Sequence, residues 1–113
     1  MAKAYFVNSA NQTVTEVEYE TLDDMRRFIG GYICIASVDH STGDVLYVDD
    51  EGMLKENLPV FAYMERLDQL LYGNGLYVGR EIETDSGKGY TTLPPTKTLK
   101  QFRNEIAFPI ELE

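Results

Sequence analysis

The residues best suited to chemistry in this sequence are the carboxylates of Asp49, Asp50 and Glu51, which stand together before Gly52. Hard cations such as Mg²⁺ and Ca²⁺ prefer carboxylate oxygens, so this turn could bind a divalent metal. A calcium-binding loop, however, requires acids at alternate positions and a glutamate six residues after the glycine, where this chain has Leu58. A solvated turn is therefore the simpler interpretation. A small-molecule or divalent-metal site, or a small enzyme that uses this turn, is the alternative.

The other reactive side chains give weak signals. His40 is the one histidine and lies in a polar segment, where a solvated side chain is typical. Cys34 is the one cysteine, which excludes an intramolecular disulfide, and it lies in an apolar run where it packs as a small hydrophobe. Gly87-Lys88 lacks the flanking residues of a phosphate-binding loop. We assign no catalytic, cofactor-binding or metal-binding residue and expect no cofactor, and the sequence does not favour an enzyme.

The charge of the chain restricts its partners. Among 113 residues, 19 acidic and 10 basic side chains leave a net charge of −9. Such a chain repels nucleic-acid phosphates and anionic membranes, so we expect no direct nucleic-acid or membrane partner. Its acids can instead compete with nucleic acid for a basic protein, although solubility is the simpler reason for them. We place the following acids on the surface: Glu16, Glu18, Glu20, Asp23, Asp24, Asp39, Asp44, Asp49, Asp50, Glu51 and Glu56.

No apolar run approaches the roughly 20 residues of a membrane helix. The first ten residues also lack the apolar core of a signal peptide. We therefore expect a cytoplasmic protein.

Two hairpins and one helix are predicted in the first half of the chain. Residues 3–8 and 13–19 are rich in β-forming residues and flank the turn formers of residues 9–12. A helix with Thr21 as its N-cap follows and ends at Gly30-Gly31. Residues 32–38 and 45–48 form a second hairpin, and their apolar density places it at the centre of the sheet.

An amphipathic helix is predicted over residues 60–71. Its evidence is the helical spacing of Val60, Met64, Leu67 and Leu71 after Pro59. Residues 76–83 then form a strand in which Gly79 marks a bulge or a close backbone approach.

Turns and short elements are predicted near the end of the chain. Residues 84–89 form a turn, and Pro94-Pro95 prevents regular structure. Thr96 caps a short helix that carries Leu99, Phe102 and Ile106. Pro109 confines a last strand over residues 107–112 to a sheet edge. The whole predicts one domain over residues 1–113 of the α+β class, with a mainly antiparallel sheet of five or six strands and two or three helices on one face.

Four motifs in order resemble the family called domain of unknown function 3846, over residues 22–79. They are Gly30-Gly31-Tyr32-Ile33, residues 46–54 with the acidic turn, Leu58-Pro59, and residues 75–79. Cys34 stands where that family has an acid, and residues 84–113, which match nothing in it, are interpreted as a C-terminal extension. The resemblance implies an origin in a phage, another mobile element or its bacterial host, and it implies no activity, cofactor or catalytic residue.

These features favour a non-enzymatic module that binds a host or phage protein, one version being acidic mimicry of nucleic acid. We expect its contact surface where Tyr32, Asp49, Asp50, Glu51 and Tyr77 converge, because exposed tyrosines beside acids suit protein contacts. A self-associating structural protein is a further alternative, since the sequence does not fix the oligomeric state.

Overall fold

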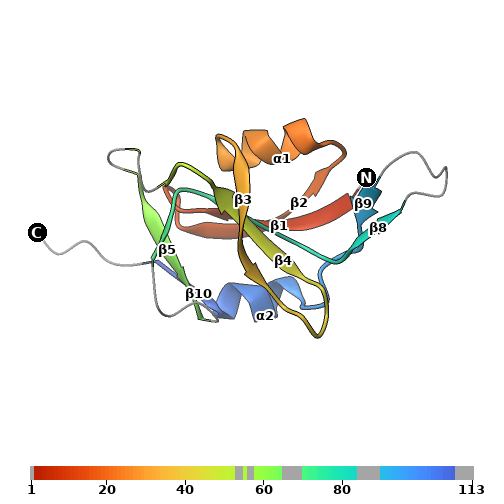
Figure 1. Ribbon diagram of the computed structural model, residues 1–113. Helices are drawn as coiled ribbons and strands as arrows, with labels where there is room; N and C mark the ends of the chain where they lie inside the picture. Colours follow the sequence, from red (N-terminus) through yellow and green to blue (C-terminus); the bar gives the residue numbers. More distant parts are fainter. Residues whose placement is uncertain (1, 53–54, 56–57, 65–69, 84–89, 109–113) are drawn as a thin grey trace, which may run out of the picture.

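The computed structural model describes residues 2–52, 55, 58–64, 70–83 and 90–108 (Figure 1). The elements of this described part are β1 (Ala2–Asn8), β2 (Thr13–Tyr19), α1 (Leu22–Ile29), β3 (Ile33–Val38), β4 (Val45–Asp49), β5 (Val60–Tyr63), β6 (Leu71–Tyr72), β7 (Gly75–Val78), β8 (Glu81–Glu83), β9 (Tyr90–Thr92), α2 (Leu99–Asn104) and β10 (Ile106–Ala107). The α+β class is confirmed. No helix in these residues is long and apolar enough to cross a membrane.

The main sheet has five antiparallel strands in the order β2-β1-β7-β4-β3. Smaller sheets have the orders β10-β5-β6 and β8-β9. Both predicted hairpins, β1–β2 and β3–β4, are confirmed. The placement of the second hairpin at the centre of the sheet is wrong, because β7 lies there and β3 forms an edge. All four residues of β7 are buried, which is the pattern of a strand covered on both faces.

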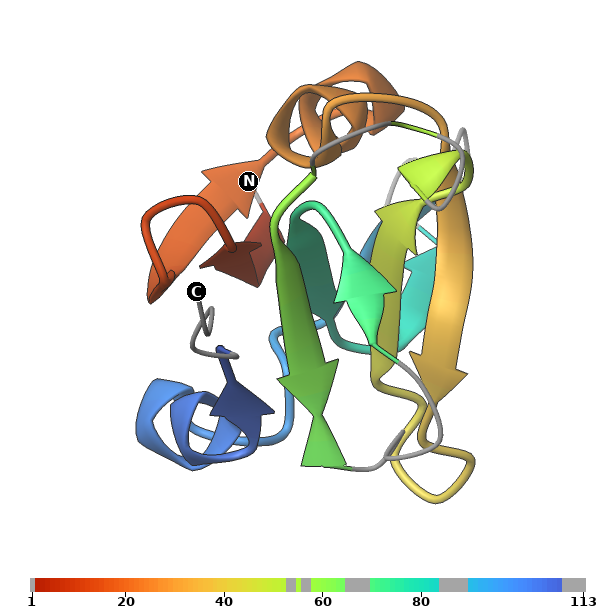
Figure 2. The ribbon, with the colours of Figure 1, turned by 90° about the vertical axis from the view of Figure 1, so that its left-hand side faces the viewer.

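The two faces of the main sheet are covered by different elements. Ala4, Leu76 and Val78 face α1 and pack with its Met25 and Ile29. The opposite face packs against β5, β6 and α2, and its buried core is Tyr5, Val7, Val14, Ala36, Leu46, Val48, Phe61, Tyr63, Leu71, Tyr77 and Phe102. Figures 1 and 2 show α1 and α2 on opposite sides of the sheet. The expectation that the helices share one face is therefore wrong.

Helix α1 begins and ends where the sequence predicts. The Thr21 hydroxyl accepts a hydrogen bond from Asp24 N at 3.2 Å, and the Asp24 carboxylate accepts one from Thr21 N at 3.1 Å. This reciprocal pair satisfies two backbone donors that the first helical turn leaves unpaired. Gly30 ends the helix with φ of 91°, a conformation that favours glycine.

The predicted helix over residues 60–71 is wrong. Residues 60–63 form β5 and residues 71–72 form β6, while residues 65–69 lie outside the described part. Phe61 and Tyr63 are buried and alternate with the half-buried Val60 and Ala62, which is the two-residue period of a strand. The helical spacing of Val60, Met64 and Leu71 is therefore coincidental.

The strand predicted over residues 76–83 is interrupted at Gly79 and Arg80, which separate β7 from β8. Gly79 N donates to Leu93 O at 3.1 Å, and Leu93 N donates to Arg80 O at 2.9 Å. A Cβ at Gly79 would lie 2.3 Å from Leu93 O, so the predicted close backbone approach is confirmed.

The short helix near the end of the chain is confirmed as α2, but its N-cap is Thr98 rather than Thr96. Ile106 begins β10, which pairs with β5, instead of extending the helix. Pro94-Pro95 lies outside regular structure as predicted. Of the strand predicted over residues 107–112, Ala107 belongs to β10, whereas residues 109–113 and the predicted turn at residues 84–89 lie outside the described residues.

Gly79→Ala is expected to lower the free energy of unfolding by about 3 kcal/mol or more, because the new methyl group meets backbone oxygens that cannot move aside. Gly73→Ala is the control: its Cβ would lie 3.6 Å from Leu58 Cδ1, so it carries mainly the strain of φ 82°, about 1–2 kcal/mol. Urea denaturation of both variants measures the difference. Equal losses of unfolding free energy in the two variants would contradict the close approach of Gly79 to the backbone of Leu93.

Candidate functional site

Two of the sequence motifs meet at one end of the main sheet. Helix α1 ends at Gly30, and β3 begins beside the end of β4. Asp50 N donates to Tyr32 O at 2.8 Å, and Ile33 pairs with Asp49 across the two strands. The structure therefore brings Tyr32, Asp49, Asp50 and Glu51 together, as predicted.

Asp49 holds this end of the sheet together. Its side chain is 4% exposed and its Oδ2 lies 2.5 Å from the ammonium of Lys55. Asp49 Oδ1 accepts a hydrogen bond from Glu51 N at 2.9 Å, and Lys55 Nζ also reaches Gly30 O at 3.4 Å. A Cβ at Gly31 would lie 3.1 Å from both Asp49 Oδ1 and Lys55 Nζ, so a glycine lets the ion pair approach the backbone. The expectation of Asp49 on the surface is wrong, because Lys55 and the turn occupy its carboxylate.

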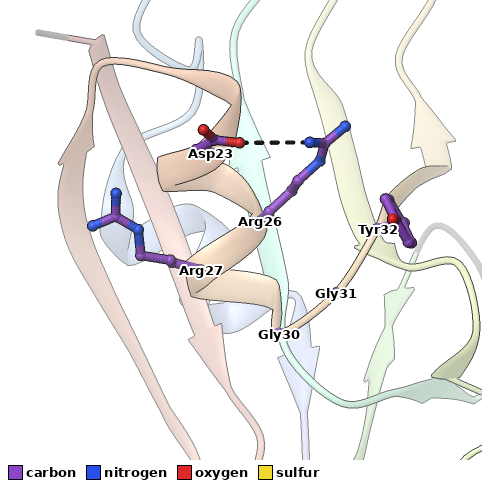
Figure 3. Close-up of a pocket in the computed structure, with 6 residues that line it drawn as sticks. All are labelled: Asp23, Arg26, Arg27, Gly30, Gly31 and Tyr32. Atoms are coloured by element: carbon purple, nitrogen blue, oxygen red, sulfur yellow. Dashed lines mark hydrogen bonds and ion pairs between the residues drawn. The ribbon is translucent and has the colours of Figure 1, made fainter.

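Tyr32 presents its ring to solvent beside the end of α1. The residue is 65% exposed, and the Arg26 guanidinium lies 5.4 Å from the ring centroid. Arg26 also lies 3.5 Å from Asp23 on the preceding turn. These residues line an open hollow of about 600 Å³ with Gly30, Gly31 and Arg27, and Figure 3 shows Arg27 pointing away from Tyr32. The cation–π contact restrains the ring while leaving it accessible.

A second hollow, of about 210 Å³, lies between β3, β4 and β6. Cys34, Asp50 and Leu70 are among its lining residues. Cys34 is half-buried and packs against the core, as predicted. Burial, together with the nearby Asp50 carboxylate that accepts its hydrogen bond, raises the pKa of the thiol. Cys34 therefore stays protonated, which is the opposite of an activated nucleophile.

Tyr77 does not join this surface. It is 1% exposed and donates a hydrogen bond to Asp44 Oδ2 at 3.0 Å. Thr96 donates to the same oxygen from its backbone N at 3.0 Å and from its hydroxyl at 2.7 Å. Asp44 is also 1% exposed, so its predicted place on the surface is wrong. Its neighbours in sequence are polar turn residues, and no local pattern reveals that its partners lie 33 and 52 positions away.

The surroundings of Tyr77 are aromatic and closed. The Tyr77 ring stacks on Phe102 with the two centroids 4.4 Å apart. The Lys97 ammonium lies 5.6 Å from the centroid of the Tyr77 ring. Burial, reinforced by Tyr63 and Asp44, raises the pKa of the Tyr77 hydroxyl far above its ordinary value. This hydroxyl is a buried hydrogen-bond donor rather than a contact for a partner.

Ile35 and Leu70 are exposed apolar residues that sequence reasoning missed. They are 57% and 45% exposed and both line the second hollow. Ile35 belongs to a strand that was expected inside the sheet, and Leu70 to the segment that was expected to be helical. No local signal reveals their exposure, because the uncharged sequence of β3 is typical of a buried strand.

The described part of the acidic turn does not present a group of metal ligands. Within the described residues, no three His, Cys, Asp or Glu side chains are grouped so that they could hold a metal ion. The Asp49 carboxylate already binds the Lys55 ammonium. Asp50 and Glu51 are exposed and remain available for contacts.

A family model described as "Domain of unknown function (DUF3846)" matches residues 2–105. The matched range contains the whole main sheet, both helices and the acidic turn, and it extends past residue 83 to the end of α2. No curated protein and no solved structure matches the chain.

Lys55→Met is expected to lower the free energy of unfolding by about 1–3 kcal/mol, because it leaves a buried carboxylate without its counterion. Lys3→Met is the matched control. Lys3 lies 3.8 Å from Glu16, and both side chains are nearly half exposed, so its loss should cost less than about 1 kcal/mol. Thermal and urea denaturation compare the two variants. Equal effects would contradict a structural role for Asp49.

Tyr77→Phe is expected to change the alkaline stability profile. Folding raises the pKa of Tyr77, so its contribution to stability is complete below the unfolded pKa of about 10 and declines above it. Burial acts in the same direction on Tyr5, Tyr19 and Tyr47, so the stability of the protein falls as the pH rises past 10.

Urea denaturation between pH 8 and 11 measures how steeply the free energy of unfolding falls with pH. This fall should be less steep in Tyr77→Phe than in the wild type, by up to about 1.4 kcal/mol per pH unit. The lost hydrogen bond to Asp44 should also cost about 1–3 kcal/mol at neutral pH. Tyr32→Phe, which alters an exposed ring, is the control. An unchanged slope in Tyr77→Phe would contradict the buried hydroxyl.

Proposed function

The chain belongs to the DUF3846 family, and we propose that it acts as a non-enzymatic module that binds another protein. The contact surface, called here the edge surface, consists of Tyr32, Ile35, Asp50, Glu51 and Leu70. The observation that carries the proposal is the exposure of three large apolar side chains, at 65%, 57% and 45% for Tyr32, Ile35 and Leu70, beside two solvated carboxylates.

This composition suits a protein interface. Exposed aromatic and aliphatic residues supply the apolar centre, and charged residues at the margin select the partner and speed its approach. Tyrosine is among the residues that contribute most to binding energy. The Arg26 contact limits the motion of the Tyr32 ring before a partner arrives, which lowers the entropy lost on binding.

The partner we propose is a host or phage protein, met in the bacterial cytoplasm by a protein of mobile-element origin. The net charge of −9 favours a basic partner and disfavours nucleic acid and anionic membranes. Acidic mimicry of nucleic acid is one version of this function. The burial of Asp44 and Asp49 removes two carboxylates from the surface that such mimicry would use.

The proposal is tested by affinity capture from bacterial cytosol with tagged protein, followed by mass spectrometry. The wild type should retain one stoichiometric protein, and Tyr32→Ser/Leu70→Ser should retain at least tenfold less. Leu22→Ser is the control, because Leu22 is 50% exposed but begins α1, at the end of the helix far from Gly30. Recovery of the bait alone, or equal capture by all three proteins, would refute the function.

The same capture at low and high salt separates the two versions of the proposed function, which are acidic mimicry of nucleic acid and binding through an apolar interface. Mimicry of nucleic acid depends on charge and should be lost steeply as ionic strength rises. An interface centred on Tyr32, Ile35 and Leu70 should be retained, because burial of apolar area does not depend on charge.

A further inference from the structure

Strand β3 is an open edge of the main sheet. It pairs with β4 on one side, and no described strand lies on its other side (Figure 2). Such a strand presents backbone N–H and C=O groups that are free to pair with another chain. Strand β3 runs through the edge surface, since Ile35 belongs to β3 and Tyr32 directly precedes β3.

β3 lacks the charged residues and prolines that normally protect an edge, and its one protective feature is a register irregularity in its pairing with β4. Ile33–Val38 contains no charged residue and no proline, and Ile35 and Val38 are 57% and 36% exposed. One register irregularity between Ile35 and Ser37 is the only interruption in its pairing with β4. The opposite edge, β2, carries Glu16 and Glu18, and its Val14 O accepts a hydrogen bond from the Arg103 guanidinium. Protein edges are usually guarded as β2 is, so β3 is the exception.

Acidic residues stand at both ends of this uncharged strand. Asp50 and Glu51 lie beside its beginning, where Asp50 N bonds Tyr32 O, and Asp39 follows its end. None of the ion pairs between described residues includes any of these three carboxylates. The nearby cations have acidic partners of their own, since Lys55 pairs with Asp49 and Arg26 with Asp23.

We propose that β3 takes up an extended segment of the partner protein, which adds to the sheet as a further strand. The segment is uncharged and β-forming in its middle, with apolar residues at alternate positions, and carries a lysine or arginine at each end. The span from Tyr32 to Asp39 is about 23 Å at 3.3 Å per residue, so the two basic residues lie about six to seven positions apart. Backbone hydrogen bonds supply affinity, and the charged ends supply specificity. This inference rests on the proposed function and names the chemistry of its partner.

A second copy of the chain is a poorer occupant. Antiparallel pairing of two β3 strands would bring Asp50 and Glu51 of each copy towards Asp39 of the other. Like charges so placed are destabilising, and each copy carries a net charge of −9.

The test uses the full chain and two capped peptides, Lys-Thr-Val-Thr-Val-Thr-Lys and Glu-Thr-Val-Thr-Val-Thr-Glu, titrated by calorimetry. The basic peptide should bind at least tenfold more tightly than the acidic one and should slow hydrogen exchange of the amides in residues 33–38. Ile35→Lys should weaken its binding at least tenfold, because a cation then guards the edge and repels the peptide. Thr15→Lys places the same cation on an exposed position of β2 and should leave binding unchanged.

Equal affinity of the wild type for the two peptides would overturn the proposal. Equal affinity of the wild type and Ile35→Lys for the basic peptide would overturn it as well. A dimer in sedimentation that Ile35→Lys dissociates would also overturn it, since the edge would then hold a second copy. If the captured protein is lost by Tyr32→Ser/Leu70→Ser but the basic peptide neither binds nor slows hydrogen exchange in residues 33–38, the binding function stands and strand addition fails. If the peptide criteria are met and no protein is captured, strand addition stands and the proposed function fails.

Discussion

The hydrogen bonds to the buried carboxylate of Asp44 are the interaction on which the packing of the C-terminal segment against the main sheet depends. A carboxylate with 1% exposure is costly to bury unless donors satisfy it, and Tyr77 and Thr96 both donate to its Oδ2, whereas its buried Oδ1 has no hydrogen-bond partner among the described residues. These bonds connect the beginning of β4, the centre of β7 and the segment that leads to α2. Lys97 comes next in the chain, where its ammonium pairs with Glu105 and its carbonyl accepts from the Tyr5 hydroxyl at 2.7 Å. The Asp44 carboxylate and the contacts of Lys97 together fix the C-terminal segment against the sheet.

The strand order determines which strand is left open. With β7 buried on both faces and bonded through Tyr77, β1 and β4 take the places beside it and β3 falls at the edge. At the other end of β4, Asp49 and Lys55 attach the acidic turn to the end of α1. Asn74 adds a second attachment there, because its amide donates to Phe28 O at 3.1 Å and accepts from Ser9 N at 3.2 Å. Tyr32 therefore projects from an end of the molecule that these contacts hold in place, although it is itself exposed.

Local patterns predicted the elements whose causes are local. The first hairpin and α1 follow from turn formers, a capping threonine and a glycine, all of which act within a few residues. The helix predicted over residues 60–71 is wrong because short apolar runs fit a helix or a strand equally well, and residues 60–63 instead pair as β5 with β10 and β6. The predictions that Asp44 and Tyr77 lie on the surface are wrong for a related reason. Each is an ordinary turn or strand residue until the fold brings it to a partner more than thirty positions away.

The charge of the chain and its open strand are best understood together. An unguarded apolar edge ordinarily promotes pairing between identical chains. Here the acids at the two ends of β3 and the net charge of −9 disfavour a second copy, yet they add no side-chain charge to the strand itself. β2 carries its glutamates within the strand, which disfavours the addition of a further strand there. Acids placed beside a strand rather than within it select for the sign of the partner's charge and leave the backbone free to pair, which is the property that a peptide-binding edge requires.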